Sequence, residues 1–349
     1  MELQLKNIGM IENANLKIDG LTVIAGENDT GKSTVGKALF ALIKADMISL
    51  MKYKTGQAKD LSSNRKRNFD RQIDLLFEGQ IANEGTIHFK SEIYVQEVNI
   101  SNNKTVEFRS PAESVERIFK DAVFLQTPLV WDLFKTFRGI ANLKSESELL
   151  GISTKIKFPY LQWDLYVKLT NEPKLTYETI KDIEQIDVSN IIKGEFKQDK
   201  SEEFKFYREN NEIEISNVST GIKQFGTLQV LLANGQIEPK RLMIIDEPEV
   251  HLHPKWQLEM AKIIVELVKN DVKVLVNSHS PYMIEALKRY SDIAGIEDKT
   301  NFYLAENGYI KKVNESNSEI LEKIFEKLSE PFDTFEEMDS KRMEKLVNG

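Results

Sequence analysis

The strongest constraint on the fold is the segment GENDTGKS, residues 26–33, which matches the pattern GxxxxGK[ST] at every fixed position. The apolar run LTVIA precedes it, and apolar residues at three- and four-residue spacing follow it from Val35 to Ile43. A strand, a glycine-bounded loop and an amphipathic helix, in this order, are the context in which the pattern binds phosphate. The alternative is an ordinary glycine turn that caps a helix, and the context argues against it. We therefore predict a phosphate-binding loop.

The residue types in this loop each suit a chemical role. Its glycines let backbone N–H groups approach phosphate oxygens, Lys32 reaches the β- and γ-phosphates, and Ser33 offers a hydroxyl to Mg²⁺. The predicted nucleotide-binding residues here are Gly26, Glu27, Asn28, Asp29, Thr30, Gly31, Lys32, Ser33 and Thr34.

A second segment with candidate catalytic residues is RLMIIDEPE, residues 241–249, in which an apolar strand ends in two adjacent carboxylates. The C-terminal edge of strands is where open α/β sheets bind ligands. Asp246 suits Mg²⁺ coordination, and Glu247 can take a proton from an attacking water. Acidic residues after a strand often only cap the next helix, but the phosphate loop in the same chain favours the functional interpretation.

A third segment, VNSHSP, closes the next apolar strand, VKVLV at 272–276, after a predicted helix over 255–269. Two apolar strands around a helix form a βαβ unit, so we predict an α/β fold with a parallel sheet. His279 at this edge can hydrogen-bond a transferring phosphoryl group. The alternative, a histidine that caps the helix starting at Pro281, is equally compatible with this segment alone.

A fourth segment, residues 215–234, reads as a strand end followed by an amphipathic helix with Ser219 at its N-cap. The helix N-terminus, with Ser219 and Gly221, forms a potential anion site. A plain capped helix is the alternative.

The chain is predicted to form a single unit over 1–349. Residues 46–211 show mixed signals and are predicted to form an inserted lid and helical lobe. Residues 212–349 carry the remaining motifs, a hairpin at Asn307-Gly308 and a helix over 319–328 with Pro331 close behind.

Composition removes several classes of site. The 349 residues include no cysteine and only four histidines, so thiolate metal centres and histidine-rich nuclease sites have little to be built from. The pair His251 and His253 lacks further ligands. No apolar run is long enough to cross a membrane, and no secretory signal is evident, which predicts a cytoplasmic protein. The net charge of −8 argues against a protein that is basic over its whole surface, so any DNA binding would need a local basic patch. The candidates for this patch are Arg65, Lys66, Arg67 and Arg71.

The order GENDTGKST, STGIKQ, IIDEPEVHLHP and NSHSP resembles the ABC-type ATPases of the SMC/RecF/OLD branch, often described as AAA-family ATP-binding proteins. The resemblance covers essentially the whole chain. It implies a P-loop NTPase fold of the ABC-ATPase head type, with a mixed sheet and an inserted helical lobe, and it implies ATP and Mg²⁺ as ligands.

The resemblance also implies roles for individual residues. Asp246 and Glu247 correspond to the Walker B pair, and His279 to the switch histidine. Ser219-Thr220-Gly221 corresponds to the signature motif, which in the family contacts ATP held by the other subunit of a dimer. Gln126 is the candidate for the Q-loop glutamine that reaches the metal, and Gln96 competes with it.

Departures from the family pattern decide between its branches. The 185 residues between Ser33 and Ser219 and the missing LSGGQ wording favour an OLD-like protein over a transporter subunit. The sequence contains no DxD pair, so the nuclease domain of OLD proteins is absent from it. We therefore expect a homodimeric ATPase that regulates a separate effector, such as a nuclease, in anti-phage defence or DNA repair. A transporter-associated ATPase and a non-hydrolysing nucleotide-gated scaffold remain the alternatives.

Overall fold

The structure is a computed structural model that describes residues 1–92, 94–110, 118–149, 156–171, 186–199, 203–311 and 316–348. Within these ranges one large sheet has the strand order β6-β5-β4-β1-β2-β14-β13-β3-β12-β11-β7, and a small sheet has the order β10-β9-β8. The strands are β1 (Glu2–Ile8), β2 (Ile11–Lys17), β3 (Leu21–Ala25), β4 (Glu84–Lys90), β5 (Val95–Ser101), β6 (Lys104–Arg109), β7 (Asp121–Leu125), β8 (Glu195–Gln198), β9 (Phe204–Arg208), β10 (Asn211–Glu214), β11 (Arg241–Asp246), β12 (Lys273–Ser278), β13 (Thr300–Glu306) and β14 (Tyr309–Lys311).

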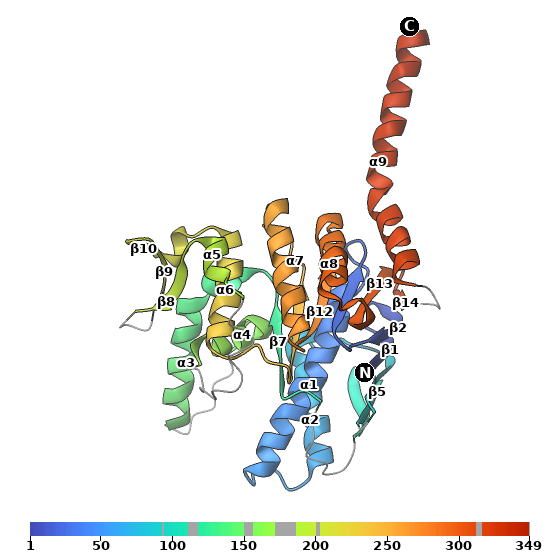
Figure 1. Ribbon diagram of the computed structural model, residues 1–349. Coiled ribbons are helices and arrows are strands. Elements are labelled where there is room, and N and C mark those ends of the chain that lie inside the picture. Colours follow the sequence, from blue (N-terminus) through green and yellow to red (C-terminus); the bar gives the residue numbers. More distant parts are fainter. Residues whose placement is uncertain are drawn as a thin grey trace.

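The helices cover both faces of the large sheet around β3, β12 and β11 (Figure 1). They are α1 (Lys32–Lys54), α2 (Leu61–Phe77), α3 (Phe134–Leu149), α4 (Tyr160–Thr170), α5 (Val188–Ile192), α6 (Thr220–Ala233), α7 (Pro254–Lys269), α8 (Pro281–Ala294) and α9 (Asn317–Asn348), with short 3₁₀ turns at Pro128–Trp131, Ile215–Asn217 and Glu297–Lys299.

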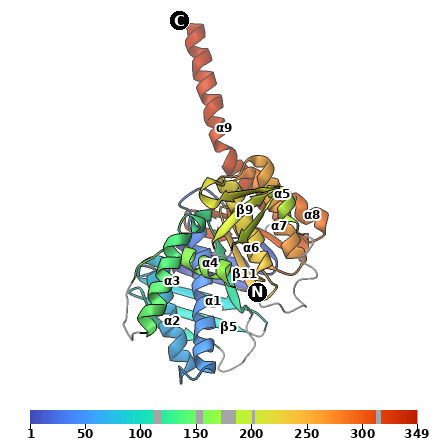
Figure 2. The same ribbon diagram turned by 90° about the vertical axis from the view of Figure 1, so that its left-hand side faces the viewer.

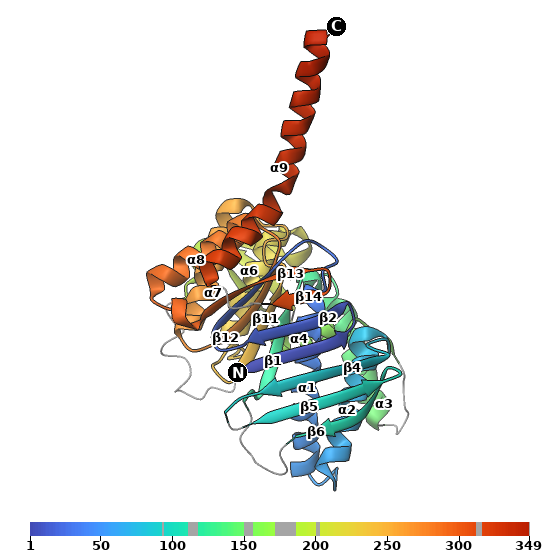
Figure 3. The ribbon, with the colours of Figure 1, turned by 90° about the vertical axis from the view of Figure 1, so that its right-hand side faces the viewer.

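The large sheet has a parallel half and an antiparallel half. Strands β13, β3, β12, β11 and β7 all pair in parallel, whereas β2, β1, β4, β5 and β6 pair antiparallel. The short β14 runs parallel to β2 and joins the halves. The two halves appear side by side in Figure 3. This arrangement confirms the predicted α/β fold with a mixed sheet.

Burial follows from these pairings. Every residue of β3 is buried, because helices cover both faces of the parallel half, whereas β1 alternates between buried and exposed residues. Successive residues of a strand point to opposite faces, so Val23 and Ile24 belong to two different hydrophobic cores. The core of Val23 includes α6, α7 and α8, and the core of Ile24 includes α1 and α2.

Residues 46–211, expected as one inserted lid and helical lobe, divide between two places. The end of α1, the helix α2 and the strands β4 to β7 belong to the main body. The helices α3, α4 and α5 and the small sheet gather beside α6, on the left in Figure 1 and facing the viewer in Figure 2. The division has a physical reason, because β4 to β6 alternate in burial and extend the antiparallel half.

The C-terminal segments include one confirmed prediction and one difference. Asn307 and Gly308 both have positive φ, 48° and 77°, and connect β13 to β14 as the predicted hairpin. The helix expected over 319–328 continues to Asn348 as α9. Its first turns bury Ile320 and Ile324, and the rest extends away from the body (Figure 1 and Figure 3).

No helix within the described ranges is both long enough and apolar enough to span a membrane.

Candidate functional site

The loop after β3 requires glycine at two positions. A Cβ on Gly26 would lie 2.4 Å from the carbonyl oxygen of Ala305, and a Cβ on Gly31 would lie 2.5 Å from Cδ1 of Ile11. Gly31 also has a φ of 87° and forms the N-cap of α1. The neighbouring strands therefore hold the loop closely, and its backbone N–H groups lie at the N-terminus of a long helix.

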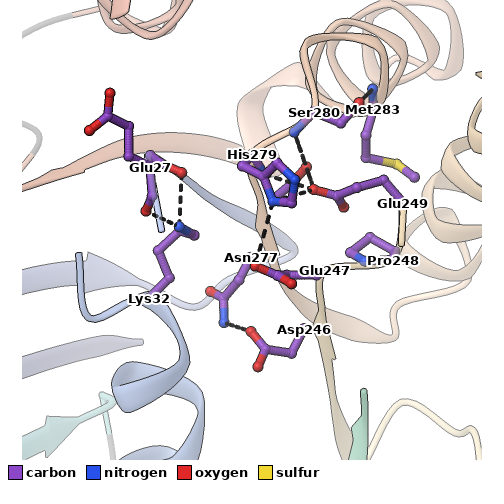
Figure 4. A network of polar contacts seen from close by, with 12 residues as sticks. Glu27, Lys32, Asp246, Glu247, Pro248, Glu249, Asn277, His279, Ser280 and Met283 are labelled. Atoms are coloured by element: carbon purple, nitrogen blue, oxygen red, sulfur yellow. Dashed lines mark hydrogen bonds and ion pairs between the residues drawn. The ribbon is translucent and has the colours of Figure 1, made fainter. Parts of the chain in front are cut away.

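Lys32 is the first residue of α1 and is buried, with 5% of its surface exposed. Its Nζ donates hydrogen bonds to the carbonyl oxygens of Gly26, at 2.8 Å, and of Glu27 (Figure 4). Burial lowers the pKa of Lys32, and the nearby carboxylates of Glu247 and Asp246 oppose this shift. The lysine thus holds the loop through neutral carbonyl groups, and its charge is only partly compensated.

Asp246, at the end of β11, is the centre of a second group of contacts. Ser33 Oγ donates to Asp246 Oδ1 at 3.1 Å, and Asn277 Nδ2 donates to the same oxygen at 2.8 Å. Gln126, which follows β7, places Nε2 at 3.5 Å from Asp246 Oδ2. Hydroxyl, carboxylate and amide oxygens are the ligands that Mg²⁺ prefers, so Ser33 and Asp246 fit this ion beside bound phosphates. Gln126 would fit it with its amide turned over, because its Nε2 faces Asp246 here. In the described part of the chain, no group of three or more His, Asp or Glu side chains could hold a metal by itself.

Gln96, the competing glutamine, lies elsewhere. It is buried in β5, in the antiparallel half, and its Nε2 donates to the hydroxyl of Tyr94 at 2.8 Å. The geometry therefore favours Gln126 over Gln96 as the glutamine beside Asp246.

Glu247 and His279 face the same space from neighbouring strand ends (Figure 4). Both side chains are partly exposed, and Nδ1 of His279 lies 3.5 Å from Oε1 of Glu247. Glu247 has a φ of 55°, a left-handed conformation that is unfavourable for a residue with a side chain. Its N–H donates to the carbonyl oxygen of Asn277 at 2.9 Å, which links the turn after β11 to β12.

The sequence analysis missed two residues of this site. Asn277 orients Asp246, and Glu249 accepts hydrogen bonds from the segment that contains His279. The signal for both was present, since Asn277 stands next to the SHSP segment and Glu249 is the third acid of DEPE.

The start of α6 lies apart from the phosphate loop. No hydrogen bond between described residues joins Ser219 or Gly221 to residues 26–34. Ser219 is exposed at the N-cap, and its hydroxyl makes no capping hydrogen bond. Gly221 packs against the turn after β11, where a Cβ would lie 3.3 Å from the carbonyl oxygen of His251.

The predicted DNA patch is wrong at Arg65. This arginine is buried in α2 and pairs with Asp46 at 2.7 Å, because the helix turns this face toward α1. Lys66 Nζ donates to the carbonyl oxygen of Val106, and Arg67 donates to Asn64. The four residues therefore do not form one exposed basic surface.

A cleft of about 780 Å³ lies beside Met10. Its lining comes from the β1–β2 turn and from the ends of β4 and β5, and it includes Met10, whose Cβ also lies beside Gly31.

Comparison with known proteins identifies the relatives of this chain. Residues 21–285 match the sequence model of a family described as "AAA domain, putative AbiEii toxin, Type IV TA system". An SMC head bound to the C-winged helix domain of ScpA has a TM-score of 0.51 and 15% identity, and the similarity covers 92% of this chain and 98% of that one. An SMC head domain from Thermotoga maritima has a TM-score of 0.46 and 13% identity, covering 90% and 98%.

A curated relative matches over a shorter stretch. The Septu protein PtuA of Bacillus thuringiensis is 34% identical over 64 residues, which is 18% of this chain and 16% of that protein.

The family match extends over more than half of the chain and contains the phosphate loop, the Asp246-Glu247 pair and His279. The large mixed sheet agrees with the SMC head architecture. The chain therefore belongs to this AAA-domain family, and its fold is that of an SMC head.

Proposed function

We propose that this protein binds ATP with Mg²⁺, hydrolyses it, and uses the cycle to open and close a homodimer that regulates a separate effector protein. The observation that carries the proposal is the convergence on Asp246. Ser33 of the phosphate loop, Asn277 of β12 and Gln126 after β7 all approach this one carboxylate, beside Lys32 and Glu247. Three separate segments of the chain thus meet at one strand edge, as phosphoryl-transfer sites require.

The nucleotide has an obvious place in this arrangement. The triphosphate occupies the loop over the N-terminus of α1, where Lys32 exchanges its carbonyl partners for β- and γ-phosphate oxygens. The cleft beside Met10 receives the nucleoside. Mg²⁺, when bound, neutralises charge that develops on the phosphate oxygens, and Ser33, Asp246 and Gln126 would hold it.

Hydrolysis then assigns a role to each side chain facing the γ-phosphate. Glu247 accepts a proton from a water whose oxygen forms a bond to the γ-phosphorus. The bond from that phosphorus to the β–γ bridging oxygen breaks, which releases ADP and inorganic phosphate. His279 donates a hydrogen bond to the γ-phosphoryl oxygens as their charge develops.

The start of α6 supports the dimer. Ser219 is exposed at its N-cap and its hydroxyl makes no capping hydrogen bond, whereas Gly221 is buried behind it. An exposed helix N-terminus of this kind suits an anionic ligand. We assign its ligand to the γ-phosphate held by a second copy. Ser219→Arg should leave ATP binding intact, because the loop is untouched, and should abolish the ATP-dependent mass increase in light scattering. A dimer that still forms in this variant refutes the assignment.

The biological setting is part of the proposal. The family description names a toxin of a type IV toxin–antitoxin system, and the curated relative is a Septu protein. Both similarities support a role in bacterial anti-phage defence, with the effector activity on another chain. Purified alone with ATP and Mg²⁺, the protein should release phosphate and leave plasmid and linear DNA uncut.

The decisive test is phosphate release by the wild type and by Glu247→Gln. The variant should bind ATP with unchanged affinity in calorimetry and turn over at least about 100-fold more slowly, the scale for losing a positioned general base. Turnover at the parental rate would show that another group is the base.

A further inference from the structure

Glu249 makes a concentrated set of hydrogen bonds that the proposed chemistry does not use. One oxygen, Oε1, accepts from Ser278 Oγ at 2.8 Å, from His279 N–H at 2.7 Å and from Ser280 N–H at 3.1 Å. The side chain is buried, with 5% of the residue exposed. Three donors on one buried carboxylate oxygen fix the backbone of these residues in one conformation.

The other oxygen of Glu249 behaves differently. Oε2 is buried and has no hydrogen-bond partner. A buried carboxylate with one unsatisfied oxygen is a costly choice for a purely structural clamp, since an apolar residue would avoid the penalty. This asymmetry points to a task for the residue beyond stability.

The position of His279 indicates that task. Its Nδ1 is buried without a hydrogen-bond partner among the described residues and lies 3.3 Å from Oε1 of Glu249 and 3.5 Å from Oε1 of Glu247 (Figure 4). The hydrogen bond to Glu249 therefore holds the backbone of His279, and only the proximity of the carboxylates bears on the ring. Both carboxylates belong to the same tight turn after β11. With Nδ1 facing this turn, Nε2 on the far side of the ring is the nitrogen left to meet a phosphate.

The same turn also contacts the helix of the predicted signature motif. Gln224 Nε2 of α6 donates to the carbonyl oxygen of Pro248 at 2.8 Å, and Gly221 packs against His251. Residues 247–252 therefore join three parts of the site: the base Glu247, the segment 278–280 and the N-terminal end of α6.

We propose that Glu249 is a positioning residue that holds the ring of His279 in register with Glu247 and passes movements of α6 to that ring. The inference rests on the proposed ATPase function. Glu249 itself touches neither nucleotide nor water. Its effect on turnover is exerted through His279.

The test compares Glu249→Ala, Glu249→Gln, His279→Ala and the double variant Glu249→Ala/His279→Ala. Glu249→Ala should lower kcat by about tenfold or more while the KM for ATP stays within about threefold, because the phosphate loop is untouched. Glu249→Gln should restore most of the rate, since an amide oxygen can accept the same three hydrogen bonds. The double variant should be no slower than the slower single variant, because both changes remove one function.

The matched control is Asp46→Ala, which removes another buried acid, bonded to Arg65 and remote from the site. It should lower the melting temperature without lowering the kcat of the folded protein. If Glu249→Ala behaves in the same way, or if its effect multiplies with that of His279→Ala, the positioning role is refuted. Should Glu249→Ala fail to fold, Ser278→Ala removes one of the three hydrogen bonds and should give an intermediate loss of kcat.

A second measurement separates this inference from the ATPase proposal. NMR signals of the His279 ring, assigned with His279→Ala and recorded without nucleotide, should shift in Glu249→Ala and stay unchanged in Asp46→Ala. An unchanged ring signal in Glu249→Ala overturns the inference even where ATP turnover is normal. If the wild type does not hydrolyse ATP but the ring signal still shifts in Glu249→Ala, only the ATPase proposal is refuted.

Discussion

Lys32 and Lys44 lie on the same helix, α1, and both are buried, with 5% and 3% of their surfaces exposed. Lys44 Nζ lies 2.7 Å from Asp121 and 2.6 Å from Asp164. Burial lowers the pKa of Lys44, but these two carboxylates raise it more, and the net shift is upward. For Lys32 the balance is reversed: burial is the largest cause, and the net shift of its pKa is downward.

One helix thus contains two buried cations whose charges are balanced in different ways. Lys44 belongs to a closed cluster in which Lys168 also contacts Asp121, at 3.2 Å, and Asp164. Its charge is satisfied within the protein. Within the described residues, Lys32 donates its side-chain hydrogen bonds to carbonyl groups, so an anionic ligand gains more from it than from a lysine that is already paired.

Disrupting the cluster around Lys44 should give the largest change, a loss of folding stability. Lys44→Met removes one cation and leaves Asp121 and Asp164 with Lys168 alone, so the free energy of unfolding should fall by about 3–5 kcal/mol. Urea denaturation measures the change. ATP affinity of the folded variant should be unchanged in calorimetry, and a loss of affinity would mean that the two lysines are coupled.

Removing the lysine of the phosphate loop should lower ATP affinity and leave stability nearly unchanged. Lys32→Ala should weaken ATP binding by at least about 100-fold, because the phosphates lose a charge-assisted partner. Its melting temperature should stay close to that of the wild type, since the lysine is only partly compensated without ligand. ATP affinity that survives the substitution would refute the phosphate-loop assignment.

Alkaline pH should lower the ATP affinity of the wild type by a smaller amount. The lowered pKa of Lys32 means that it loses its proton below the ordinary value of 10.5, while phosphate binding requires the charged form. ATP affinity should therefore fall by up to about tenfold per pH unit above that lowered pKa. Lys32→Arg, which stays charged, should show a flat profile in calorimetry over the same pH range. A wild-type affinity that stays flat up to pH 10.5 would contradict the downward shift.

The two lysines should also affect stability with opposite signs as pH rises. The unfolded chain binds more protons at position 32 than the folded chain does, so this contribution to stability increases with pH above the lowered pKa. The raised pKa of Lys44 gives stability that is complete below 10.5 and is lost as the pH rises further.

The parallel half of the molecule was largely predictable from sequence. Short apolar strands that end at Ala25, Asp246 and Ser278 have to lie inside a covered sheet, and parallel strands bring their carboxyl ends to one edge. Local patterns therefore predicted which segments meet at the site.

Contacts between distant residues were not predictable in this way. Nothing in the sequence around Lys44 indicates that Asp121 and Lys168 complete its cluster, because the partners come from β7 and α4. Gln126 and Gln96 each follow apolar residues, and only the sheet order separates them. The antiparallel extension by β4 to β6 depends on pairing with β1, which a short alternating pattern does not specify.

The backbone conformation of Glu247 lowers the stability of the fold, whereas its side chain is needed for the proposed activity. Its φ of 55° is costly for glutamate, by about 1 kcal/mol, and nearly free for glycine. A glycine here would relax the turn and make the folded chain more robust, while removing the carboxylate assigned to the water. Selection for thermal stability alone would thus favour loss of the carboxylate at position 247. Engineering of a more stable version of this protein should therefore keep Glu247 unchanged from the outset.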